Sequence, residues 1–130
     1  MPAVYLDSSA LVKLIIREPE SRALYRYLAG RPNRVSSVLA RVEVPRAARR
    51  HGNAAIDRAR LLLARIGLLR LDDALLDAAG EIELTGLRSL DAIHLTAARA
   101  LDAELIAVVT YDSRMIEAAR ALSLPVVEPR

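Results

Sequence analysis

Short runs of strand-forming residues alternate along this chain with longer segments whose apolar residues recur at helical spacing. The short runs predict five strands, near residues 3–6, 33–38, 68–71, 104–111 and 125–128. The longer segments predict helices near residues 9–16, 20–30, 37–52, 53–67, 72–84, 89–101 and 112–123. Strands that alternate with helices are typical of a parallel sheet in an α/β protein. The run at 104–111 is almost continuously apolar, as expected for a strand that is buried on both faces.

Residues with strong local preferences mark the predicted helix boundaries. Four polar residues stand where helices should begin and are expected to cap them: Ser37, Asn53, Asp72 and Ser89. Gly52 is expected to end the helix that Ser37 begins. Pro45 lies inside that same helix, where it should kink the helix or delay its start, because proline lacks a backbone donor. Such a kink would also change the direction of Glu43.

Length and composition limit the class of protein. A chain of 130 residues predicts a single domain spanning residues 1–130. The absence of cysteine excludes disulfides and thiolate metal sites and fits a reducing cytoplasm. We expect neither a signal peptide nor a membrane span, because the apolar run at the N-terminus meets Asp7 after a few residues. The net charge is +3, and Lys13 is the only lysine, so the basic side chains are otherwise arginines. That charge permits nucleic acid as a partner.

Four acidic residues stand out because apolar residues or strand ends surround them: Asp7, Glu43, Asp91 and Asp112. Two of them follow predicted strands, where ligands bind in an open parallel sheet. The other two lie near the starts of predicted helices. Each could instead be a helix cap, a salt-bridge partner or a solvated side chain. For Asp7 we expect a different role, since the two serines that follow it could cap the next helix.

The four acids, if they meet in one cleft, predict a metal site. Carboxylates in a cluster repel one another when no cation is present. Mg²⁺ uses one or two carboxylates together with waters and phosphate oxygens as ligands. Two such ions can stabilise both the attacking and the leaving oxygen at a phosphodiester.

Four segments of the sequence resemble the four motifs of the PIN domain, and most closely those of its VapC toxin branch. They are VYLDSSALVKL, SSVLARVEVPRA, SLDAIHLTAARAL and VVTYDSRM, and the resemblance runs from residue 4 to about 127. It implies a three-layer α/β/α fold whose five-stranded parallel sheet has the strand order 3-2-1-4-5. It also implies a Mg²⁺- or Mn²⁺-dependent endoribonuclease that acts on RNA, is usually a homodimer and is neutralised by a VapB-like antitoxin.

The resemblance also assigns roles to individual residues. Asp7, Glu43, Asp91 and Asp112 correspond to the acidic quartet, in which Asp7 and Asp91 would bind the metal most directly. Thr110 corresponds to the hydroxyl residue that often stands two positions before the fourth acid. Two serines, Ser8 and Ser9, would support the ligands.

Four basic residues near the quartet have open roles. His94 follows Asp91 by three residues and would be a ligand, a base or, as we expect, a packed supporting residue. Arg46 and Arg50 share the helix face of Glu43 and would contact RNA phosphates or pair with surface acids. His51 at a predicted helix end suits the helix dipole, and we expect no catalytic role for it.

Three other classes of protein share some of these features. A phosphorelay receiver needs a lysine after a late strand, whereas Lys13 lies in the first helix. A haloacid dehalogenase-like phosphatase needs an aspartate two residues after the first, where this chain has Ser9. The stronger alternative is a PIN-fold module that binds RNA or protein without cutting. The presence of all four acids favours the enzyme.

Overall fold

The computed structural model describes all 130 residues and contains one five-stranded sheet. All neighbouring strands are parallel, and their order is β3-β2-β1-β4-β5, which confirms the predicted α/β fold and strand order. The strands are β1 (Ala3–Leu6), β2 (Arg34–Ser37), β3 (Gly67–Leu69), β4 (Leu105–Val109) and β5 (Val126–Val127).

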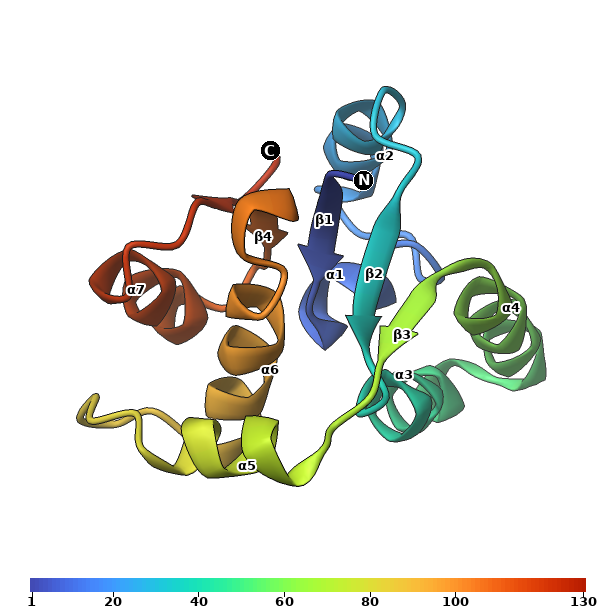
Figure 1. Cartoon of the computed structure of the whole chain (residues 1–130). Coiled ribbons are helices and arrows are strands. Elements are labelled where there is room, and N and C mark those ends of the chain that lie inside the picture. Colours follow the sequence, from blue (N-terminus) through green and yellow to red (C-terminus); the bar gives the residue numbers. More distant parts are fainter.

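Helices cover both faces of this sheet, so the chain has three layers. Figure 1 shows α5, α6 and α7 on one side of the strands and α3 and α4 on the other. The α-helices are α1 (Ser8–Val12), α2 (Ser21–Leu28), α3 (Ala40–Ala48), α4 (Asn53–Arg65), α5 (Asp73–Gly80), α6 (Ser89–Arg99) and α7 (Ser113–Ala121). The chain also forms two short 3-10 helices, Arg49–His51 and Asp102–Glu104.

Strand β1 lies at the centre of the sheet and is buried on both faces. Its side chains alternate, as the period of a strand requires. Val4 and Leu6 belong to the cluster formed with α1 to α4, whereas Tyr5 packs in the cluster that includes Ala97 and Ala98 of α6. The strand that carries Asp7 at its end is therefore fixed by core packing from both sides.

The register between β1 and β4 determines what lies at the carboxyl edge of the sheet. Leu6 is paired with Val109, and the Asp7 backbone N–H donates to the Val109 carbonyl oxygen at 3.2 Å. The residues that follow these strands, Asp7 and Thr110, consequently lie side by side. In Figure 1 the arrows of β1 and β2 point toward the edge where α3 begins.

The helix boundaries differ from the sequence prediction in several places. Asp72 caps α5 as expected, because its side chain accepts a hydrogen bond from the Leu75 backbone N–H. The other three capping predictions were wrong: Ser37 ends β2 and Leu39 is the cap of α3, while Asn53 and Ser89 are already the first helical residues of α4 and α6. Helices α1 and α5 are also shorter than predicted, since they end at Val12 and Gly80.

Pro45 lies inside α3 without ending it. The helix runs from Ala40 to Ala48, so Pro45 falls in its second turn. The Arg41 carbonyl lacks the helical N–H donor that any other residue at position 45 would supply. Glu43 precedes the proline and lies in the first turn, so the proline leaves the turn that carries Glu43 intact.

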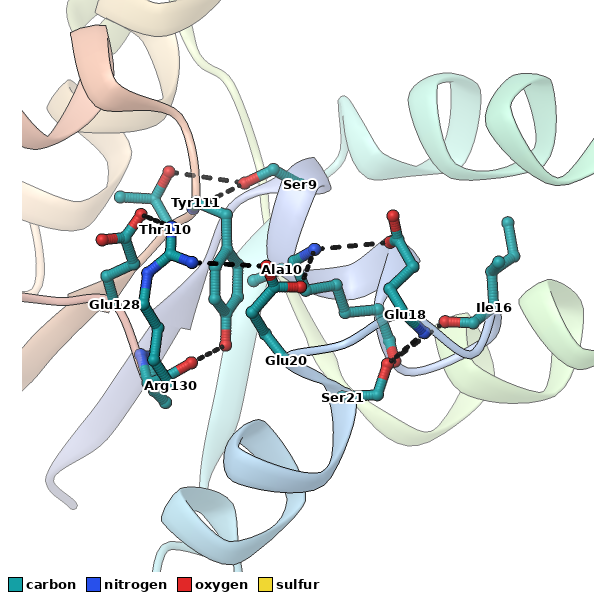
Figure 2. Close-up of polar contacts among 12 residues, drawn as sticks. Ser9, Ala10, Ile16, Glu18, Glu20, Ser21, Thr110, Tyr111, Glu128 and Arg130 are labelled. Carbon is teal, nitrogen blue, oxygen red and sulfur yellow. Dashed lines mark hydrogen bonds and ion pairs between the residues drawn. The ribbon is translucent and has the colours of Figure 1, made fainter.

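The C-terminal residues are tied to the segment between α1 and α2, beside the same edge of the sheet. Figure 2 shows Arg130 between Glu20 and Glu128, at 3.3 and 2.9 Å, and the Tyr111 hydroxyl donating to the Pro129 carbonyl oxygen. These contacts hold Tyr111, the residue after Thr110, against the body of the protein.

Helices α2 and α4 use most of their apolar residues in the core. Leu24 and Leu28 of α2 are buried, as are Ala55 and Ala59 of α4. Their larger exposed apolar side chains are Tyr25 and Leu61. None of the helices is long and apolar enough to cross a membrane.

Candidate active site

Asp7 lies at the end of β1 with its carboxylate buried and held by three hydrogen bonds. Its side chain is surrounded so closely that the residue is only 3% exposed. Ser9 Oγ and the Ala10 backbone N–H donate to Oδ1, at 2.6 and 3.0 Å, and Thr110 Oγ1 donates to Oδ2 at 2.6 Å. Ser9 also accepts from the Tyr111 backbone N–H (Figure 2). Strand register and the first turn of α1 thus fix the position of both Asp7 oxygens.

The bond from Ala10 makes Asp7 the N-cap of α1, which was one of the alternatives left open for it, and neither serine caps that helix. Ser8 and Ser9 instead donate to carboxylates, to Glu43 and Asp7 respectively. Burial raises the pKa of Asp7 above its ordinary value, although the hydrogen bonds from Ser9, Thr110 and Ala10 act in the opposite direction. Ionisation of Asp7 is therefore less favourable in the folded protein than in water.

Glu43 reaches the site from α3 and is oriented by Ser8 and His94. Ser8 Oγ donates to its Oε1 at 2.7 Å, and His94 Nε2 lies 2.7 Å from the same oxygen. Burial alone would raise the pKa of Glu43, but the bonds from His94 and Ser8 outweigh it and lower the pKa. Its second oxygen, Oε2, accepts no hydrogen bond from the protein.

His94 is buried between Glu43 and Tyr5, which agrees with the supporting role expected for it. The Tyr5 hydroxyl lies 2.7 Å from His94 Nδ1. Because the Glu43 carboxylate can only accept, Nε2 carries the proton that it shares with Glu43. Burial raises the pKa of Tyr5 above its ordinary value, so its hydroxyl keeps its proton and can donate to Nδ1. Both ring nitrogens are thus engaged away from solvent.

Asp91 and Asp112 form the outer part of the site and share one cation, Arg88. Asp91 lies in the first turn of α6, and Asp112 is the N-cap of α7. Arg88 Nε is 3.1 Å from Asp91 Oδ2, and Arg88 Nη2 is 3.1 Å from Asp112 Oδ2. The bond with Asp91, followed by the charges of both carboxylates, raises the pKa of Arg88 above its ordinary value.

Three of the four acids are linked through single bridging residues, whereas Glu43 is held by Ser8 and His94. Thr110 connects Asp7 to Asp112, because its hydroxyl donates to Asp7 and accepts from the Asp112 backbone N–H at 3.1 Å. Arg88 connects Asp112 to Asp91. No three acidic or histidine side chains of the chain are arranged closely enough to hold a metal ion. The predicted residues lie at one edge of the sheet, but their side chains are spaced more widely than the ligands of a bound metal ion.

The donor atoms nevertheless suit a hard divalent cation. All four side chains offer carboxylate oxygens, which Mg²⁺ and Mn²⁺ prefer. Asp91 and Asp112 already flank one positive group, so their oxygens can face a shared cation. Asp91 Oδ1, like Glu43 Oε2, accepts no hydrogen bond from the protein. The donor chemistry of the four acids therefore fits the predicted metal, although the side chains lie farther apart in this structure than ligands of one bound ion.

A basic groove of about 580 Å³ opens beside Glu43. It lies along α3 and the 3-10 turn that follows, with Leu90 of α6 on its rim. Three of its lining side chains are arginines, Arg46, Arg49 and Arg50. None of the three forms an ion pair with an acid of the chain. Arg46 and Arg50 therefore do not pair with surface acids, which was one of the two roles considered for them.

Two residues of the site were missed in the sequence. Arg88 stands three positions before Asp91, a spacing that brings side chains together at the start of a helix, and this signal was available. Tyr5 gave no such signal, because a tyrosine within a buried strand looks like any other core residue. Its contact with His94 spans 89 positions and depends on how α6 packs against β1.

The fold and the acids at its carboxyl edge define a PIN-type nuclease, and comparison with known proteins narrows this class. The sequence matches the PIN domain family over residues 4–121. It is 52% identical over 129 residues to ribonuclease VapC46 of Mycobacterium tuberculosis, covering 99% of both chains. Ribonucleases VapC47 and VapC35 of the same species are 39% and 43% identical, with 97% of this chain and 96% of each relative covered.

The chain therefore belongs to the VapC ribonucleases of the PIN domain family, which confirms the predicted ribonuclease function. Among solved structures, the fold is similar to that of Mycobacterium tuberculosis VapC20, a toxin that cleaves the sarcin-ricin loop. The TM-score is 0.76, with 97% of this chain and 99% of that chain covered. At 16% sequence identity, this likeness concerns the fold alone.

Proposed function

We propose that this protein is a divalent-metal-dependent endoribonuclease, the toxin of a toxin–antitoxin pair, with Asp7, Glu43, Asp91 and Asp112 as its active site. The observation that carries the proposal is the meeting of four acids, from β1, α3, α6 and the end of β4, at one edge of a VapC-family fold. A bound Mg²⁺ or Mn²⁺ would activate water and stabilise charge on the phosphoryl oxygens.

The residues of the chain would divide the remaining work. Asp91 and Asp112 would offer carboxylate oxygens to a cation, and Asp7 would add negative charge from the end of β1. Ser8 and His94 hold Glu43 through Oε1, so its Oε2 would be available to a cation or a water. No histidine is needed as a general base, which agrees with the buried position of His94.

Cleavage of RNA by protein stripped of metal with EDTA tests this proposal. We expect activity to return with Mn²⁺ or Mg²⁺ and to stay absent in Asp91→Asn protein purified identically, a variant that also reports any contaminating nuclease. Binding of RNA without cleavage at millimolar Mn²⁺ would instead favour the non-cleaving module.

The groove lined by Arg46, Arg49 and Arg50 is the proposed path of the RNA backbone, since unpaired arginines beside the acids match phosphate in charge and geometry. We expect Arg46→Gln with Arg50→Gln to weaken RNA binding in EDTA. The slope of log Kd against log salt should fall by about 1.4, at about 0.7 per single-strand phosphate contact. Arg22→Gln with Arg26→Gln on α2 makes the same charge change and should leave the slope unaltered.

A small VapB-like antitoxin is the proposed protein partner. The outer acids lie in a basic protein, so an extended antitoxin segment carrying arginine could pair with them through its two-pronged guanidinium. Asp91→Ala with Asp112→Ala should weaken antitoxin binding while the circular dichroism spectrum stays unchanged. Unaltered affinity would place inhibition at another surface.

A homodimer is the proposed assembly, with Tyr25 and Leu61 as its exposed apolar side chains on α2 and α4. Sedimentation velocity of the wild type against Tyr25→Ser with Leu61→Ser tests it. A dimer that persists in the double variant would exclude this surface.

A further inference from the structure

Arg88 holds the two outer acids through two nitrogens of one guanidinium group. Its Nε and Nη2 each lie 3.1 Å from one carboxylate, Asp91 on α6 and Asp112 at the start of α7. Both contacts are made to the Oδ2 atoms. One positive group thus neutralises part of the charge of two carboxylates that would otherwise repel each other.

Arg88 is also much more exposed than the groups it pairs. Its side chain is 59% exposed, against 9% for Asp91 and 27% for Asp112. Exposed ion pairs contribute little to stability and exchange readily. Arg88 is the cap position of α6 and forms no side-chain capping bond, so its side chain can move without disturbing the helix.

From this geometry we infer that Arg88 is the resident counter-cation of the metal-free site, which a divalent cation must displace from Asp91 and Asp112 before it binds. The inference rests on the proposed function, because it takes these acids as metal ligands. It adds a residue that sets metal affinity. Arg88 supports the outer acids when no metal is bound and competes with the metal for the same oxygens.

Calorimetric titration of metal-free protein with Mn²⁺ tests the competition. Arg88→Gln should lower the Kd for Mn²⁺ on the order of tenfold, because two weak ion pairs no longer have to break. Arg88→Lys keeps the charge but loses the second prong, and it should lower the Kd by about threefold. In the absence of metal, Arg88→Gln should melt at a lower temperature than the wild type, because its outer acids repel each other.

Arg114→Gln is the matched control, since Arg114 is two residues from Asp112 and forms no ion pair. Its Kd should stay within about twofold of the wild type, as the removal of a nearby surface charge has a small effect.

Equal Kd values for the wild type and both Arg88 variants would overturn the inference, as would weaker binding in Arg88→Gln. If the Kd falls in Arg88→Gln but not in Arg88→Lys, the net charge alone explains the change in affinity. That result would also overturn the displacement of Arg88 by the metal. Absence of Mn²⁺ binding by the wild type would instead refute the metal site of the proposed function.

Discussion

The active site has two halves that the protein builds in different ways. The inner half is Asp7, which is buried and receives three hydrogen bonds from Ser9, Ala10 and Thr110. The outer half is the pair of Asp91 and Asp112, whose main side-chain partner is the exposed Arg88. Neutral donors from strand ends and a helix start fix the inner half, whereas one displaceable cation holds the outer half.

The two halves therefore suit two different tasks: the inner half fixes the position of a carboxylate, and the outer half can exchange its bound cation. Hydrogen bonds from Ser9, Ala10 and Thr110 fix the Asp7 oxygens before any ligand binds, and such preorganisation favours catalysis. The single cation of the outer half is itself exposed, so Asp91 and Asp112 can change partner when Arg88 moves into solvent. A site that must take up a cation and then a phosphate gains from having one rigid half and one exchangeable half.

Replacement of the inner carboxylate should have the largest effect. Asp7→Asn keeps the size of the side chain but removes its charge, so we expect RNA cleavage to fall on the order of 10³-fold, equivalent to several kcal/mol of lost transition-state stabilisation. Calorimetry should show weakened Mn²⁺ binding. Asp77→Asn, the same change on the exposed face of α5, should cut like the wild type. Cleavage by Asp7→Asn at a wild-type rate would remove Asp7 from the site.

The two halves also differ in how well the sequence predicted them. The alternation of strands and helices predicted the parallel sheet, and apolar neighbours singled out all four acids. Strand order came from the family motifs, because periodicity alone does not define which strands are adjacent. The partners of the acids were harder to predict, since they depend on register and helix packing. Thr110 was expected from its motif, whereas the contact of His94 with Tyr5 follows only from the position of α6 over β1.

The capping errors have a local physical cause. Ser, Asn and Asp all favour the cap position, so their presence predicts a helix start to within a residue or two. The serines that follow Asp7 were considered as alternative caps, yet the hydroxyl groups of Ser8 and Ser9 donate to Glu43 and Asp7. Because both serine hydroxyl groups donate to carboxylates of the site, Asp7 is the residue that caps α1.

Loss of one donor to Asp7 should have an intermediate effect. Thr110→Val keeps the shape but removes the bond to Asp7 Oδ2, and we expect metal affinity and cleavage to fall by about 10–100-fold. The lost bond lowers the Asp7 pKa, so its removal raises that pKa, and the acid limb of the pH–rate profile should move to higher pH.

Thr96→Val provides the control for this substitution. Thr96 is equally buried, but its hydroxyl has no hydrogen-bond partner. Its replacement should leave the acid limb in place and preserve or raise thermal stability. An acid limb that stays fixed in Thr110→Val would show that ionisation of Asp7 does not control the rate.

The smallest expected effect is a gain in stability that accompanies the loss of activity in Asp7→Asn. The pKa of Asp7 is raised in the folded protein above its ordinary value of 3.8, so the folded state binds this proton more tightly than the unfolded state does. The contribution of Asp7 to stability is therefore fully present below pH 3.8 and decreases as the pH rises through the folded pKa.

Asparagine has no charge to bury, so the melting temperature of Asp7→Asn in EDTA should exceed that of the wild type by a few degrees at pH 7. In a domain of this size, about 4 °C corresponds to about 1 kcal/mol. The advantage should shrink as the pH falls through the raised folded pKa, below which Asp7 itself is neutral. A difference that is absent at pH 7, or that grows as the pH falls, would show that the hydrogen bonds from Ser9, Ala10 and Thr110 fully compensate the buried charge.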